Sequence, residues 1–254
     1  MSLEPDSPWT FFIVTITFSW IFWGALFLQS NRESFTPYGV MFYVGGLGPM
    51  ISALCLTYHE SNRRGVLELL GATLNFSNLS LTGLALILFA STLPNIISVL
   101  IGKPPDQPLI VMDLSLGSSF PWLTFLFLVS ITEETGWRAY ALPRLLEEYT
   151  PLVSSLIHGS VWVVWHLPLF MIDGTWQYRL GFLTPAFFSY MIQLLPRSIL
   201  MTWVFKWAGY NPSSAVLYHF FVNLTGELLD VTQRADLLRF GIEIIMALIL
   251  LFLG

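Results

Sequence analysis

Charged residues are scarce in this sequence. Lys, Arg, Asp and Glu make up 11% of the 254 residues, against about 25% in a soluble domain, and hydrophobic residues make up 55%. Charge runs and low-complexity segments are also lacking, so there is little room for a separate soluble domain or a disordered tail. No basic run marks a contact with nucleic acid. These absences predict an integral membrane protein with a single domain over residues 1–254.

Cysteine is nearly absent as well. Cys55 is the single cysteine, which excludes an internal disulfide, and we expect it to be a small buried apolar residue. The N-terminus lacks the basic start of a signal peptide, because residues 1–8 are acidic and contain two prolines. We therefore expect the first apolar run to be a retained span and not a cleaved leader.

Long apolar windows indicate how the chain crosses a bilayer. They predict an all-α, polytopic membrane protein with about eight transmembrane helices, at residues 9–29, 38–58, 81–102, 119–142, 151–172, 181–204, 212–230 and 237–253. The connection at 59–80 contains an apolar piece, Val66–Leu70, that is expected at the membrane interface. Pro151 and Pro212 are well placed for the first turn of a helix.

The fourth predicted span contains three charged residues. Each charged side chain at the bilayer centre opposes insertion by roughly 2.5–3.5 kcal/mol, so such residues normally have a function or a tight pairing. Glu134 and Arg138 are four residues apart, with the acid first, and are predicted to form a pair. Glu133 points about 100° away from Glu134 on a helix and is left for chemistry. Gly136 permits the close approach of a neighbouring helix.

Two later spans carry most of the other polar residues. The fifth contains His158, Trp162 and His166 at four-residue steps, and the seventh contains His219 and Asn223 four apart. A carboxylate, imidazoles and an amide from three helices can activate water and stabilise an oxyanion, or bind a divalent metal. A single histidine on an apolar helix is more often a packing residue, and we interpret His158 in that way.

Charged residues elsewhere in the spans are interpreted as partners of one another. Arg239 and Glu243 are four apart, which favours a pair along one helix. Arg197 is a candidate to neutralise Glu227, which lies four residues after Asn223.

Three short motifs in order resemble the CPBP family of intramembrane proteases, the CAAX-prenyl-protease and bacteriocin-processing (Abi) group. The family pattern is EExxxR, then FxxxH, then HxxxN, on separate membrane helices. Residues 133–138 match the first motif and residues 219–223 match the third. Residues 162–166 match the second with Trp in place of Phe. The motif core covers about residues 119–230.

The resemblance implies an endopeptidase that hydrolyses peptide bonds of membrane-associated substrates, including prenylated proteins of the CaaX type. Carried over by position, Glu133 and His166 would activate the hydrolytic water. His219 and Asn223 would orient that water or stabilise the oxyanion. The site residues expected to support this group are Glu134, Arg138 and Trp162.

The same residues leave the question of a metal open. Glu133, His166 and His219 could supply three ligands to a catalytic zinc, with a fourth position for water. The sequence has no HExxH helix, so the usual signature of soluble zinc proteases is absent. Metal-dependent and metal-free, glutamate-driven hydrolysis are both compatible with this set. The expected partners are the lipid bilayer and a peptide or lipidated-protein substrate, without nucleic acid, in a prokaryotic cell membrane.

Two other functions fit parts of the pattern. A non-catalytic membrane immunity protein of the same family would bind a peptide in the pocket without turnover. A proton-coupled carrier would also contain intramembrane carboxylates and histidines. Carriers often show two similar halves, whereas here the polar residues gather in the second half and no internal repeat is visible. Proteolysis accounts for the complete motif set and is the leading hypothesis.

Overall fold

The computed structural model describes residues 6–28, 35–112, 115–229 and 231–253. Within these ranges the chain consists of helices and their connections, without a β-strand. One isolated β-bridge joins Ile110 to Leu229. The predicted all-α class is confirmed.

Eleven α-helices lie in the described part of the chain. In order, they are α1 (Pro8–Leu28), α2 (Phe35–Gly46), α3 (Gly48–Thr73), α4 (Leu81–Gly102), α5 (Leu116–Glu134), α6 (Leu142–Glu148), α7 (Pro151–His166), α8 (Trp176–Leu180), α9 (Pro185–Trp207), α10 (Pro212–Leu228) and α11 (Gln233–Leu253). Three short elements link some of them: the 3₁₀ turns η1 (Phe76–Asn78) and η3 (Leu167–Met171), and the π-helical segment η2 (Thr135–Ala141).

The structure supports a membrane protein but not the predicted number of spans. By length and composition, three helical runs in the described residues can cross a membrane: α1, α4 and Pro151–Met171. A fourth follows if Gly39–Gly46 and Gly48–Thr73, which are bent by 51° at their junction, count as one span. Three to four spans are therefore supported, and not the predicted count of about eight.

Charge and length account for the difference. Helix α11 carries Asp236, Arg239 and Glu243 within two turns, and α10 is only 17 residues long. The predicted window at 119–142 is divided among α5, η2 and α6. Each of these segments is apolar enough to form a predicted window, but buried charge and short length weaken it as an independent span.

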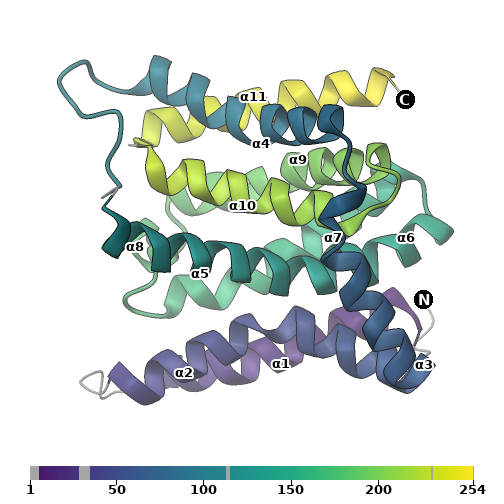
Figure 1. Ribbon diagram of the computed structural model, residues 1–254. Coiled ribbons are helices and arrows are strands. Elements are labelled where there is room, and N and C mark those ends of the chain that lie inside the picture. Colours follow the sequence, from purple (N-terminus) through teal and green to yellow (C-terminus); the bar gives the residue numbers. More distant parts are fainter. Residues whose placement is uncertain (1–5, 29–34, 113–114, 230, 254) are drawn as a thin grey trace.

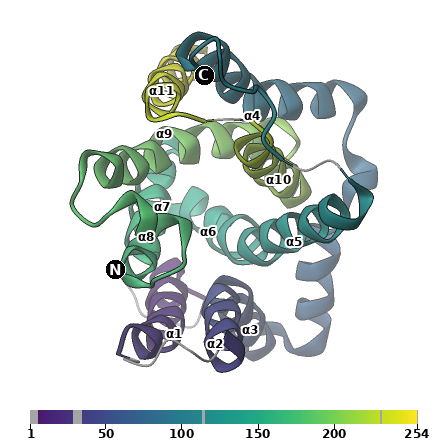
Figure 2. The same ribbon diagram turned by 90° about the vertical axis from the view of Figure 1, so that its left-hand side faces the viewer.

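The helices form layers (Figures 1 and 2). Helices α1, α2 and the first part of α3 lie on one side, α4 and α11 lie on the opposite side, and α5, α7, α9 and α10 lie between them, while the part of α3 after its kink runs toward α4. Helix α9 packs against α7 and α11, while α10 packs against α4 and α5. The three helices that carry the sequence motifs, α5, α7 and α10, therefore lie in the middle of the molecule.

Helix α3 differs from the sequence prediction in two ways. The chain continues as helix through most of 59–80, with a kink at Asn62 (φ 55°), so Val66–Leu70 belongs to the second half of α3. Cys55 is exposed on this helix, so its predicted burial is wrong. An apolar side chain on a membrane protein does not need protein around it, because lipid offers an equally apolar environment.

The helix starts follow local rules. Pro151 and Pro212 begin α7 and α10, as predicted, and the Thr150 side chain accepts a hydrogen bond from the Val153 N–H. The Asn211 side chain caps α10 by accepting from the Ser213 N–H. These caps fix where the two histidine-bearing helices begin.

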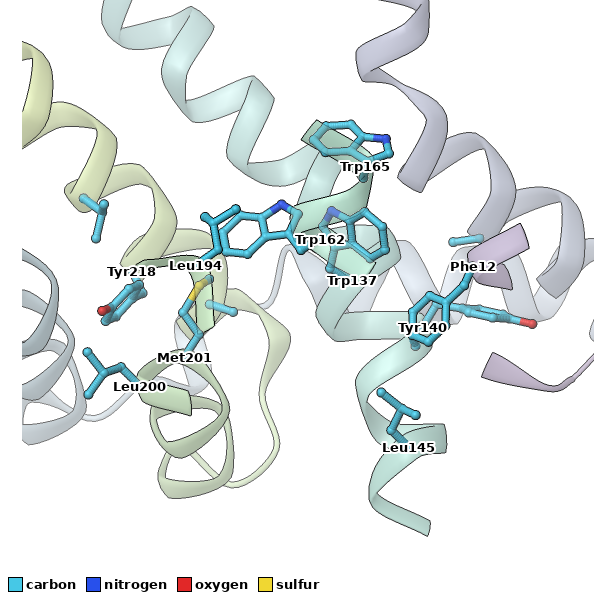
Figure 3. Close-up of a cluster of buried hydrophobic side chains, with 14 of the residues drawn as sticks. Phe12, Trp137, Tyr140, Leu145, Trp162, Trp165, Leu194, Leu200, Met201 and Tyr218 are labelled. Atoms are coloured by element: carbon cyan, nitrogen blue, oxygen red, sulfur yellow. The ribbon is translucent and has the colours of Figure 1, made fainter. Parts of the chain in front are cut away.

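A cluster of buried aromatic side chains holds the middle layer to α1 (Figure 3). Trp137 of η2 packs edge-on against Phe11 of α1 at a ring-centroid distance of 5.5 Å, and against Trp165 of α7 at 5.8 Å. Trp165 donates its indole N–H to Ser19 Oγ at 2.8 Å. Large interlocked rings of this kind fix the position of η2 and α7 relative to each other.

Candidate functional site

One large cavity, about 980 Å³ in volume, opens among the middle helices. Four of the predicted site residues line it, namely Glu133 of α5, His166 of α7, and His219 and Asn223 of α10. These residues are far apart in the sequence and come from three helices. The structure thus brings the predicted carboxylate, imidazoles and amide together on the wall of one cavity.

Glu133 is almost fully buried, and its surroundings explain how it is held. The Trp162 indole N–H donates to Glu133 Oε2 at 3.1 Å. Among the described residues, that is the single hydrogen bond given to this carboxylate, so Oε1 remains available on the cavity side. A carboxylate with one fixed oxygen and one available oxygen is suited to accept a proton from water.

Glu134 has a different environment although it is the next residue. It is fully buried and does not line the cavity. Its Oε1 accepts from Arg138 Nη1 at 3.0 Å and from His219 Nδ1 at 2.7 Å. The predicted Glu134–Arg138 pair is confirmed, and the hydrogen bond to His219 ties α5 to α10.

Arg138 is also fully enclosed. Its guanidinium lies 4.6 Å from the ring centroid of Trp162, and Nη2 contacts Met201 Sδ at 3.2 Å. A guanidinium over an indole face gains cation–π attraction, which is stronger away from water. Arg138 thus fixes both Glu134 and the tryptophan that holds Glu133.

The segment that carries Arg138 is π-helical, which the sequence did not predict. Single π-helical turns inside α-helices occur frequently at functional sites. Gly136 lies in this segment against the backbone of Pro49 in α3, and an added Cβ would overlap it. The predicted close approach at Gly136 is therefore present, with α3 as the neighbouring helix.

The two cavity histidines have defined ring orientations. His166 donates from Nδ1 to the Trp162 carbonyl at 2.8 Å, because a carbonyl can only accept. In the neutral ring, Nε2 then carries the lone pair. His219 uses Nδ1 toward Glu134, which again leaves Nε2 for other partners. Both imidazoles are thus held through Nδ1, and their second nitrogens are left for the cavity.

Trp162 contacts four other residues of the site. Its ring lies 5.6 Å from the His166 ring and 5.7 Å from the His219 ring, measured between centroids. It also donates to Glu133 and stacks under Arg138. A phenylalanine, which the family pattern has here, would keep the aromatic wall but could not donate the hydrogen bond to Glu133.

The geometry does not form a ready metal site. No group of three His, Cys, Asp or Glu side chains in the described ranges is arranged to hold a metal ion. The hydrogen bonds from the histidine Nδ1 atoms are of the type that orients metal-ligating imidazoles. Since Glu133, His166 and His219 do not converge on one point in this structure, we derive no step through a metal.

Three sequence interpretations concern residues outside this group. His158 is buried, contacts Ser198 Oγ at 3.2 Å and does not line the cavity, in agreement with a packing role. The predicted Arg239–Glu243 pair is wrong, and the carboxylate that Arg197 neutralises is Glu243 and not the candidate Glu227. Arg239 pairs with Asp236, three residues before it on the same helix, whereas the pair of Arg197 with Glu243 joins two helices and cannot be found from sequence spacing.

Arg197 of α9 binds Glu243 of α11, with a distance of 2.8 Å between Nη2 and Oε1. Arg239 pairs with Asp236 and also donates to Asn95 Oδ1 of α4 at 3.0 Å. These two arginines line the same cavity as Glu133, a role that the sequence reasoning missed. The available signal was that both are charged residues inside predicted spans.

Comparisons with known proteins agree with the motif reading. The model of the family described as Type II CAAX prenyl endopeptidase Rce1-like matches residues 115–225, which include all three motifs. A protein named CAAX prenyl protease 2, from Methanococcus maripaludis, is 26% identical over 250 residues. That alignment covers 95% of this chain and 92% of the relative. The similarity thus extends well beyond the motifs, into the flanking helices.

Proposed function

We propose that this chain, which belongs to the CPBP family of membrane proteases, is an intramembrane endopeptidase that cleaves membrane-associated, CaaX-type prenylated peptides. The observation that carries the proposal is the position of Glu133, His166, His219 and Asn223 around one cavity of about 980 Å³. The relative from M. maripaludis, named as a CAAX prenyl protease, supports the substrate class. Its archaeal source supports a prokaryotic cell membrane as the location.

In the proposed mechanism, Glu133 is the general base. Its Oε1 takes a proton from a water molecule in the cavity while Oε2 stays fixed by Trp162. The His166 Nε2 lone pair accepts a hydrogen bond from the same water and orients it. The water oxygen attacks the peptide carbonyl, and the proton held by Glu133 then passes to the leaving amine. One water is consumed, and a carboxylate and an amine are released.

The other two residues act on the carbonyl oxygen. The Asn223 side-chain amide can donate to the oxyanion that forms when water adds. With Nδ1–H donating to the Glu134 carboxylate at 2.7 Å, His219 can also donate from Nε2 when both ring nitrogens carry a proton, a form whose positive charge the adjacent carboxylate stabilises. Removing one such donor typically lowers kcat by about 100- to 1,000-fold.

The direct test is cleavage of a fluorogenic prenylated CaaX peptide by the purified protein in detergent, with and without a chelator. We expect cleavage by the parent protein and a rate at least about 100-fold lower with Glu133→Gln. Cleavage that persists in chelator supports metal-free hydrolysis, whereas loss that is restored by added zinc assigns a metal to this site. A folded Glu133→Gln protein that cleaves at the parent rate would contradict the proposal.

The immunity-protein alternative makes the opposite prediction. A protein that only binds a peptide has no requirement for the proton-accepting oxygen of Glu133. If Glu133→Gln and His219→Ala kept full biological activity, binding without turnover would replace hydrolysis as the function.

A further inference from the structure

The cavity changes chemistry from one side of Glu133 to the other. Toward α2 and α5 its wall is aromatic, with Tyr43 edge-on to Phe125 at 5.8 Å and Trp122 stacked on Phe125 at 5.1 Å. Toward α9 and α11 its wall contains arginines. Helices α5, α7 and α10 lie between α2 and α11 (Figure 2), so the proposed reaction centre separates an apolar end from a charged end, where Asp236 lines the cavity beside Arg197 and Arg239.

Arg197 is held in a way that leaves part of its guanidinium unused. Nη2 donates to Glu243 Oε1 at 2.8 Å and to Gln193 Oε1 at 3.2 Å, and Nε donates to Glu243 Oε1 at 3.3 Å. Nη1 has no hydrogen bond to any other described residue, and the side chain keeps about a tenth of its surface exposed on the cavity wall. A guanidinium fixed on one edge presents its remaining N–H groups in a defined direction.

Arg239 reinforces the positive charge at this end. Its Nη2 donates to Gln193 Oε1 at 2.8 Å, the oxygen that Arg197 also uses, and its Nε is buried without a partner among the described residues. Glu243 neutralises one guanidinium from the buried side. The partner of the other, Asp236, is 21% exposed, where solvent screens its charge more. Asp236 also lines the cavity, so the part of the cluster that can accept an anion is the unpaired Nη1 edge of Arg197.

The distance along α9 from the residue that contacts His166 to Arg197 matches the length of a short peptide. Tyr190 lies edge-on to His166 at 5.7 Å, and Arg197 follows it by seven residues. Seven helical residues rise by about 10.5 Å. Three extended residues span at most roughly 10–11 Å. The three residues that follow the prenylated cysteine of a CaaX sequence are therefore long enough to reach from the neighbourhood of His166 to Arg197.

We propose that Arg197, supported by Arg239, binds the free C-terminal carboxylate of the peptide substrate, with the lipidated part of that peptide toward the aromatic end. This inference rests on the proposed function and assigns the direction in which the substrate lies. Arginine is the side chain best suited to a carboxylate, because its planar N–H groups match the two oxygens. The role is one of specificity, separate from the proton transfer at Glu133.

Two prenylated peptides that differ only at the C-terminus test the proposal. One ends in the free acid and the other in the amide, and kcat/KM is measured for both with the full-length protein in neutral detergent. We expect the parent to prefer the acid by roughly 10- to 100-fold, the range of a hydrogen bond between charged groups. Arg197→Gln should reduce that preference to about twofold or less.

Controls separate this role from a structural one. Arg197→Gln strands Glu243 without its partner, so the double variant Arg197→Gln/Glu243→Gln removes both charges together and should also lose the preference. Arg64→Gln, at an exposed ion pair with Glu68, should keep the full preference. The parent's preference requires no variant and therefore does not depend on the folding of any.

The outcomes distinguish the two proposals. Equal cleavage of acid and amide by the parent, with Glu133 still required, would overturn the carboxylate subsite and leave the protease intact. A preference that survives in both Arg197 variants would also overturn it. Cleavage of neither peptide would contradict the protease proposal, and the subsite would fall with it.

Discussion

The cavity borders two buried charged clusters that are built in opposite ways. In the acidic cluster, Glu134 pairs with the one arginine, Arg138, while Glu133 is held by Trp162 and lines the cavity. In the arginine cluster, Arg197 and Arg239 share the oxygen of one glutamine, and the guanidinium edge left over faces the cavity. In each cluster the paired atoms fix the frame, and the polar atoms that remain without a partner are the ones available to a ligand.

The difference between Glu133 and Glu134 should be the largest effect. Glu133→Gln is expected to lower kcat by about 100- to 10,000-fold, the usual contribution of a general base, because an amide cannot accept the proton from water. Its thermal stability in detergent should stay close to that of the parent. Single-turnover peptide cleavage and a melting curve measure the two quantities. Glu68→Gln, at an exposed position of α3, is the matched control and should change neither.

Glu134→Gln should instead lower stability. The substitution leaves Arg138 buried without its charged partner, and breaking a buried ion pair in this way costs about 3–5 kcal/mol. It also weakens the hydrogen bond to His219. Denaturant unfolding of the detergent-solubilised protein measures the loss. Equal stability of the Glu133 and Glu134 variants would show that the two carboxylates are not divided as described.

Gly136→Ala tests whether the acidic cluster depends on its contact with α3. The added methyl group would overlap the Pro49 backbone, and overpacking of this kind costs typically 1–3 kcal/mol. Gly71→Ala places the same methyl group in open space on α3 and should be neutral or slightly stabilising. Melting temperatures of the two variants give the comparison. A Gly136→Ala protein as stable as Gly71→Ala would mean that η2 shifts freely.

Trp162→Phe should produce the smallest effect. The ring wall remains, but Glu133 loses the N–H that fixes Oε2, and a net hydrogen bond contributes about 0.5–1.5 kcal/mol. We expect a fall in kcat of roughly three- to tenfold. Trp165→Phe is the matched control, since its N–H binds Ser19 and not Glu133. Similar losses in the two variants would remove the special role of Trp162.

Local pairs were accessible from the sequence, and distant pairs were not. The i,i+4 spacing of Glu134 and Arg138 predicted their ion pair correctly, because both residues lie on one helical segment. The same rule failed for Arg239 and Glu243, because Arg239 pairs with Asp236 three residues before it on α11 and Glu243 binds Arg197 of α9. The bond between Glu134 and His219 joins residues 85 positions apart, and spacing carries no information about it.

The membrane class and the helical class followed from composition, whereas the number of spans did not. Windows of apolar residues located the helices well, yet charged side chains such as Arg197 lie inside several of them. Those charges are neutralised by partners on neighbouring helices, for example Glu243 for Arg197. Hydropathy treats each window alone and therefore cannot distinguish an independent span from a helix that depends on its neighbours.

Cleavage of a prenylated CaaX peptide in water enriched in ¹⁸O tests the central claim most directly. If water held by Glu133 attacks the peptide carbonyl, mass spectrometry should find ¹⁸O in the new carboxylate of the prenylated fragment. Glu133→Gln should form the labelled fragment at least about 100-fold more slowly than the parent. Two results would contradict the account. One is a peptide that stays intact after incubation with the folded parent protein, and the other is labelled fragment formed by Glu133→Gln at the parent rate.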